Sequence, residues 1–178
     1  YVTVPVEYRL IPEALYPAGL YDIKAAIRWL RANAGTYGID TSRIAVSGTS
    51  AGGQLANLMG ATNGSPIHED GHNHINHSSR VQAVITIDGL CDFAAETIMN
   101  RAKKARENGD KMPVDAQWLG GTFEESPRNW MLASPIYWVS RQSAPVCFIN
   151  SAIPRFHEGR DRQIAKMDAL GIYSEVHT

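Results

Sequence analysis

Residues 43–53 read Arg43-Ile44-Ala45-Val46-Ser47-Gly48-Thr49-Ser50-Ala51-Gly52-Gly53. The first half of this stretch is β-branched and apolar, which is typical of a short strand, and the small residues from Ala51 to about Ala61 favour a helix. Gly48, Ser50 and Gly52 form a Gly-x-Ser-x-Gly pattern at the junction. A serine on such a tight strand-to-helix turn is exposed at the carboxyl edge of a sheet. The junction therefore predicts an α/β fold with Ser50 as a nucleophile.

The residues of this turn have distinct expected structural and catalytic roles. Gly48 and Gly52 lack a Cβ atom, so we expect them to let the strand and the helix approach closely. The backbone N–H of Ala51 begins the helix and has no intrahelical acceptor, so it can donate to a developing oxyanion. The competing interpretation is a structural turn in which Ser50 only caps the helix.

The rest of the chain alternates short apolar runs with helical patterns. Strands are expected over residues 2–8, 43–48, 81–87, 145–150 and 172–177, and helices from Gly19 and over residues 51–61 and 159–170. Strand–helix–strand order implies right-handed crossovers and a mostly parallel sheet. We therefore expect a single α/β domain over residues 1–178, with helices on both faces of the sheet.

Residues 92–135 interrupt this alternation. They contain a charged helical stretch at residues 101–107, followed by a tryptophan- and glycine-containing motif at residues 117–121 and by Asn129-Trp130. An excursion of this length between two strands is usually functional or mobile. We predict a cap-like insertion beside the active site, with the charged stretch as a solvated helix face.

The composition of the chain limits the classes of binding partner that we expect. The chain has 178 residues, is 44% hydrophobic and 20% charged, and carries a formal net charge of −1. This charge gives no reason to expect binding to nucleic acid or to an anionic membrane, and no stretch approaches the roughly 20 apolar residues of a membrane span. Cys91 and Cys147 lie beside apolar runs and are expected to be buried thiols rather than a disulfide. No cofactor is implied, and the loop with His68, His72, His74 and His77 has no established metal-binding spacing.

Further landmarks lie on both sides of the Ser50 turn. They read Glu7-Tyr8-Arg9-Leu10, Tyr16-Pro17-Ala18, Ala25-Ala26-Ile27-Arg28-Trp29-Leu30, Asp40-Thr41-Ser42-Arg43-Ile44, Trp118-Leu119-Gly120-Gly121 and Ala133-Ser134-Pro135-Ile136. With residues 47–53 they resemble α/β-hydrolase esterases of the hormone-sensitive lipase and feruloyl-esterase type, and the resemblance covers most of the chain. Residues 148–157 look closer still to a bacterial branch of carbohydrate esterases that includes pectin and acetylxylan esterases.

The resemblance implies a three-layer α/β-hydrolase fold that is incomplete at both ends. It also implies a serine carboxylester hydrolase that forms an acyl-enzyme on acyl or methyl esters of plant polysaccharides, and a secreted or periplasmic location. Two alternatives stay open, because one scaffold serves many functions. They are a serine peptidase of the prolyl-oligopeptidase type and a non-catalytic binding domain of α/β-hydrolase type.

Relatives of this type carry two further catalytic parts. A His-Gly-Gly-Gly loop supplies the second oxyanion donor before the strand at residues 2–8, and the catalytic His follows the last strand. The resemblance therefore places the second donor before Tyr1 and the His beyond Thr178, as in an internal fragment of a longer esterase.

The acid of the triad is ambiguous in the sequence. Relatives usually place an Asp in the loop after the strand at residues 145–150, but residues 152–155 carry no carboxylate. Glu158 and Asp161 come next, and Asp92 follows the strand at residues 81–87. We favour Asp161, although an acidic residue in the first turn of a helix also suits the helix dipole.

Overall fold

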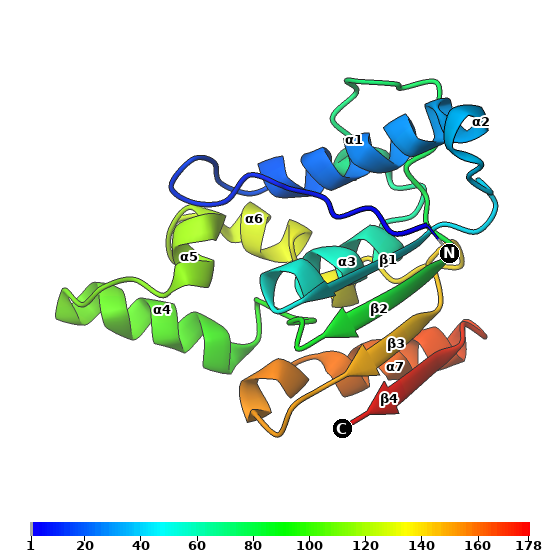
Figure 1. The fold of residues 1–178 in the computed structure, drawn as a ribbon. Helices are drawn as coiled ribbons and strands as arrows, with labels where there is room; N and C mark the ends of the chain where they lie inside the picture. The colour runs from blue at the N-terminus through cyan, green and yellow to red at the C-terminus, as the bar shows by residue number, and fades with distance from the viewer. Residues whose placement is uncertain (1) are drawn as a thin grey trace.

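A four-stranded parallel sheet forms the centre of the computed structural model, which describes residues 2–178 (Figure 1). Its strands lie side by side in chain order and are β1 (Ala45–Thr49), β2 (Ala83–Ile87), β3 (Val146–Ile149) and β4 (Ser174–His177). All three pairings are parallel. This sheet confirms the α/β class and four of the predicted strands.

Seven helices accompany the strands among the described residues. They are α1 (Ala18–Ala32), α2 (Ala34–Tyr37), α3 (Ala51–Ala61), α4 (Glu96–Asn108), α5 (Val114–Leu119), α6 (Pro127–Leu132) and α7 (Arg160–Ala169), with short 3-10 turns at Pro66–His68, Pro135–Tyr137 and Pro154–His157. Helix α1 buries Leu20, Ile23, Ile27 and Leu30, because this spacing places them on one helical face.

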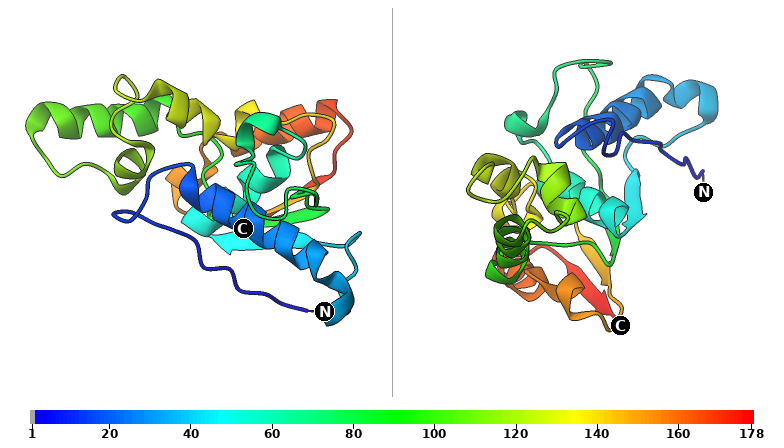
Figure 2. Two further views of the ribbon diagram at one scale, coloured as in Figure 1. Left: turned by 90° about the horizontal axis from the view of Figure 1, so that it is seen from above. Right: turned by 90° about the vertical axis from the view of Figure 1, so that its left-hand side faces the viewer.

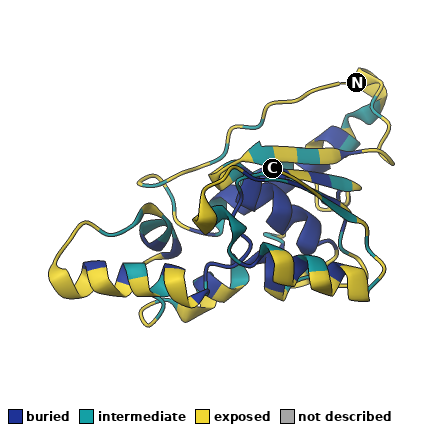
Figure 3. Ribbon diagram, turned by 90° about the horizontal axis from the view of Figure 1, so that it is seen from below, coloured by how far each residue is buried: buried dark blue, intermediate teal, exposed yellow. Residues whose placement is uncertain are grey.

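The helices cover one face of the sheet. Because successive strands are immediate neighbours, right-handed crossovers bring every connecting helix to the same side. Helix α3 packs there against β1 and β2, with Leu55 and Leu58 buried. The other face has no helix over it in the described part of the chain: the register partners Ser47 and Ile85 are exposed there and Cys147 is half-buried. Figure 3 shows how exposed and buried residues are distributed along the ribbon. The expectation of helices on both faces is therefore met on only one of them within residues 2–178.

The predicted strand at residues 2–8 is wrong. The segment runs outside the sheet (Figure 2) and belongs to no strand. A cavity of about 270 Å³ separates it from β1, with Val4 and Val6 on one wall and Ile44 and Val46 on the other. A strand needs a neighbouring backbone for its ladder, and β1 pairs only with β2 among the described residues. The β-branched pattern was insufficient without that partner.

Residues 92–135 leave the sheet and form α4, α5 and α6. Helix α4 extends away from the sheet (Figures 1 and 2) and buries only Ile98, Ala102 and Ala105. Trp130 of α6 is fully buried, and its Nε1 donates to the carbonyl of Gly121 at 3.1 Å. The predicted insertion is thus a folded helical segment, and its role as a cap stays a prediction.

A buried ion cluster fixes the loop between α3 and β2 onto α1. Arg28 donates to Glu69 Oε2 and Asp70 Oδ1, both at 2.7 Å, and to the carbonyls of His72 and Asn73, both at 2.8 Å. Its side chain is only 3% exposed. The loop is therefore held by one planar guanidinium that satisfies four acceptors, and by Lys24, whose Nζ lies 2.8 Å from Glu69 Oε1.

We expect Arg28→Ala to lower the free energy of unfolding by about 3 kcal/mol, because Asp70 loses its ion-pair partner and two carbonyls lose their donor, whereas Glu69 keeps its ion pair with Lys24. Urea denaturation measures the change. The matched control is Arg43→Ala, whose side chain is 85% exposed and pairs only with Asp40. It is expected to leave the denaturation midpoint unchanged. Equal effects of the two substitutions would contradict this interpretation of the cluster.

Candidate active site

Ser50 occupies the turn between β1 and α3 with an unusual backbone. Its φ is 54° and its ψ is −116°, a conformation that non-glycine residues rarely adopt. Its N–H donates to the carbonyl of Ile87 at 2.8 Å, and its carbonyl accepts from the N–H of Gln54 at 2.9 Å. Its side chain is exposed and makes no capping hydrogen bond. The turn therefore presents a free hydroxyl, which removes the interpretation of Ser50 as a simple helix cap.

The two glycines of the pattern differ in how tightly they are packed. A Cβ at Gly48 would lie 2.3 Å from the carbonyl oxygen of Gly52, whereas a Cβ at Gly52 would meet only the Tyr8 hydroxyl at 3.5 Å. A Cβ at Gly53 would lie 2.6 Å from the carbonyl oxygen of Ile87. The close approach expected at Gly48 is present, but the second close contact is at Gly53 and not at Gly52. The sequence pattern could not separate these adjacent glycines.

A cavity of about 150 Å³ opens beside Ser50 and Ala51. The N–H of Ala51 opens α3, where the helix provides it with no acceptor. Most of the wall is apolar. The lining residues are Tyr8, Leu10, Ile11, Ser50, Ala51, Gln54, Leu55, Asp88, Leu90, Phe93, Val114, Asp115, Trp118, Arg155 and Phe156.

Four of these residues belong to the segment predicted as a cap, namely Phe93 and three residues of α5. Val114, Asp115 and Trp118 come from α5. Trp118 packs edge-on against Tyr16, with ring centroids 5.2 Å apart, and lies 5.9 Å from Phe93. Residues far apart in the chain thus meet at one cavity at the carboxyl end of β1.

The carboxylates favoured from the sequence do not line this cavity. Asp161 is in the first turn of α7, its side chain is 79% exposed, and it pairs with Arg160 at 2.8 Å. Glu158 accepts a hydrogen bond from Thr97 at 2.7 Å. Both carboxylates are therefore engaged in contacts outside the cavity.

Asp92 is held elsewhere as well. Its side chain is 1% exposed and pairs with Arg162 at 2.5 Å, and Tyr137 donates to the same oxygen at 3.4 Å. Asp88 lies in the cavity beside Ser50 and has no ion-pair partner among residues 2–178, and sequence reasoning missed it. The signal was present, because Asp88 immediately follows the predicted strand at residues 81–87.

None of the six histidines, all of which lie within the described residues, lines the cavity. His68 is buried between Ser65 and the carbonyl of Leu132, and burial lowers the pKa of its imidazole. His157 comes nearest in the chain, next to the lining residue Phe156, and its Nε2 lies 2.8 Å from the carbonyl of Ser151.

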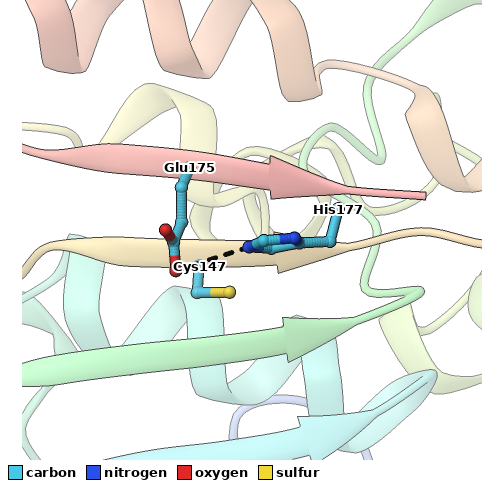
Figure 4. A group of neighbouring side chains, drawn as sticks. All are labelled: Cys147, Glu175 and His177. Atoms are coloured by element: carbon cyan, nitrogen blue, oxygen red, sulfur yellow. Dashed lines mark ion pairs between the residues drawn. The ribbon is translucent and has the colours of Figure 1, made fainter.

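His177 lies on the uncovered face of the sheet with Glu175 and Cys147 (Figure 4). The potential ligand atoms of these three side chains lie within 4.8 Å of one another, and His177 Nε2 is 3.6 Å from Glu175 Oε1. Burial, aided by contact with Glu175, raises the pKa of the Cys147 thiol. Both cysteines are free thiols, and burial raises the pKa of Cys91 to about 12.

Comparison with known proteins gives these features a context. Residues 1–155 match the BD-FAE family. Esterase LipC of Mycobacterium tuberculosis is 32% identical over 152 residues, which are 85% of this chain and 36% of LipC. Carboxylesterase NlhH of the same organism is 53% identical over 58 residues, which are 33% of this chain and 18% of NlhH. The chain therefore spans only about a third of LipC.

A solved structure is similar to this chain as well. The truncated form of a carbohydrate esterase from gut microbiota superposes with a TM-score of 0.74 and 26% identity, covering 96% of this chain and 62% of that chain. Among the helices described here, none is both long enough and apolar enough to cross a membrane. The matched residues include the Ser50 turn and most of the cavity lining. The chain belongs to the BD-FAE family and carries the α/β-hydrolase type of fold that its sequence predicted.

Proposed function

We propose that the polypeptide containing this chain is a serine carboxylester hydrolase in which Ser50 attacks the ester carbonyl. One observation carries the proposal: the Ser50 hydroxyl, which has no hydrogen-bond partner among the described residues, lies on a strained strand-to-helix turn and lines an apolar cavity. The esterase names of LipC and NlhH support the reaction class.

In the proposed reaction, Ser50 Oγ bonds to the carbonyl carbon while its proton passes to an imidazole base. The electron pair of the carbonyl π bond moves to the oxygen, and the Ala51 N–H stabilises that oxyanion. Collapse of the tetrahedral intermediate expels the alcohol, which takes the proton from the imidazolium. Water then hydrolyses the acyl-enzyme by the same steps and frees Ser50.

We place the base and the second oxyanion donor in polypeptide outside residues 1–178. Two observations support this. The histidines of this chain do not line the cavity, and the chain spans 36% of LipC. Turnover of a nitrophenyl ester by the isolated chain, lost in both Ser50→Ala and His157→Ala, would show instead that His157 is the base.

The proposed substrates are acyl or methyl esters of plant polysaccharides. The apolar cavity suits an acyl group, and the carbohydrate esterase that superposes on this chain supports a sugar alcohol on the leaving side. The longer protein should hydrolyse nitrophenyl esters and acetylated xylan but not peptide anilides. Cleavage of the anilides at a comparable rate would favour the peptidase alternative. Absence of Ser50-dependent labelling by a fluorophosphonate would favour a binding domain.

Trp118 is expected to limit the size of the acyl group, because it forms a wall of the cavity. Trp118→Leu in the longer protein should raise the ratio of kcat/KM for a butyryl over an acetyl nitrophenyl ester about tenfold, the size expected for a small change in an apolar pocket. The control is Trp29→Leu, since Trp29 is 41% exposed and lies outside the cavity. An unchanged ratio in Trp118→Leu would remove α5 from the substrate site.

A further inference from the structure

Asp88 occupies a special place next to the Ser50 turn. It directly follows β2, and the last residue of that strand, Ile87, accepts the hydrogen bond from Ser50 N–H. Thr49 and Ile87 are register partners, so Ser50 and Asp88 are the next residues along neighbouring parallel strands. Both residues therefore leave the sheet at the same edge and line the same cavity.

The carboxylate of Asp88 is held from one side only. Its Oδ1 accepts the backbone N–H of Ser151 at 2.8 Å, and its own N–H donates to the carbonyl of Ile149 at 2.9 Å. Its φ is 51°, in the left-handed region. These bonds fix Asp88 against the end of β3, while Oδ2 has no hydrogen-bond partner among residues 2–178.

The charge of Asp88 is also uncompensated. Asp115, the other carboxylate of the cavity wall, pairs with Arg101, and Asp92 and Asp161 pair with Arg162 and Arg160. Asp88 makes no ion pair with any described residue, including Arg155, which lines the same cavity. A negative charge held in an apolar cavity is suited to face a group that becomes positive during the reaction.

We propose that Asp88 is the triad carboxylate: its Oδ2 accepts the Nδ1–H of the imidazole base that takes the Ser50 proton. This inference rests on the serine mechanism proposed above. Asp88 acts through the imidazole, so it is a positioning residue that fixes the tautomer and stabilises the imidazolium. The loop after β3, which has no carboxylate at residues 151–155, supplies the Ser151 N–H that anchors Asp88.

Asp88→Asn in the longer esterase tests this assignment. The amide oxygen can still accept the Ser151 N–H, and Asn tolerates a left-handed backbone as well as Asp does, so the fold is expected to persist. We expect kcat for a nitrophenyl ester to fall about 10³–10⁴-fold, with KM changed less than threefold. Circular dichroism and the thermal midpoint check the fold.

A pH profile distinguishes an effect of Asp88 on the imidazole base from a purely structural role of Asp88. A carboxylate beside an imidazole favours its charged form, so removing the charge lowers the pKa of the base. The acidic limb of kcat/KM should therefore move to lower pH in Asp88→Asn, while Asp161→Asn, whose side chain lies outside the cavity, keeps the wild-type limb.

The results that would overturn the assignment are distinct from those that would overturn the serine mechanism. Asp88→Asn with activity within threefold of wild type removes Asp88 from the triad. So does a loss of about 10³-fold or more, with the shifted limb, in Asp161→Asn, Asp92→Asn or Glu158→Gln instead. Persistent turnover in Ser50→Ala would refute the mechanism itself, whatever the Asp88 variants show.

Discussion

Replacing Ser50 by alanine is expected to lower kcat of the longer protein by about 10⁴–10⁶-fold, because the acyl-enzyme can no longer form. The fluorophosphonate adduct should disappear as well, since the probe reacts only with an activated hydroxyl. The start of α3 should be little affected, because the Ser50 hydroxyl makes no capping hydrogen bond. The measurements are the hydrolysis of a nitrophenyl ester and mass analysis of the labelled protein.

Ser47→Ala is the matched control. Ser47 lies in the same strand, three residues earlier, and is exposed on the sheet face that the helices leave uncovered. Its loss should leave kcat and labelling unchanged. Full labelling of Ser50→Ala, or equal losses in both variants, would contradict the role given to Ser50.

The sequence predicted best the elements whose signals are local. Helix α3 spans the predicted residues 51–61, because a glycine turn and a run of small residues determine its start and its length. The strand pattern at residues 2–8 failed for the opposite reason. Its apolar alternation is a local property, but a strand also needs a partner backbone, and residues 2–178 provide none there.

The candidate site divides in the same way. Ser50 and Ala51 could be identified from the sequence, because the turn that exposes them is determined by residues that are adjacent in the chain. Asp88 could not be ranked above Asp161, because its position depends on the register of β1 with β2 and on a hydrogen bond from Ser151. The spacing of residues along the chain does not determine which strands pair in the sheet.

Gly48 and Gly52 are expected to respond in opposite ways to alanine. In Gly48→Ala the new Cβ would lie 2.3 Å from the carbonyl oxygen and 2.4 Å from the carbonyl carbon of Gly52, and both atoms belong to the backbone of α3. A backbone cannot rotate away as a side chain can, so the strand and the helix must separate. We expect a loss of about 3 kcal/mol or more in the free energy of unfolding, at the upper end for overpacking.

Activity should fall further than stability alone explains. Ser50 and the Ala51 N–H lie within the same turn, and a displacement of about 1 Å costs roughly 10²-fold in rate. Gly48→Ala that remains folded should therefore lose at least about 10²-fold in kcat. Gly52→Ala provides the contrast, because its Cβ would meet only the Tyr8 hydroxyl at 3.5 Å. Alanine also favours a helix over glycine by up to about 1 kcal/mol.

We therefore expect Gly52→Ala to match or exceed wild type in urea stability and to keep kcat within about threefold, since ordinary van der Waals contact displaces nothing. The same denaturation curves and ester assay serve both variants. If Gly52→Ala loses as much stability and kcat as Gly48→Ala, then both glycines are needed for their backbone conformational freedom rather than for steric room. Damage confined to Gly48→Ala would show that steric room at one Cβ position keeps the Ser50 turn closed.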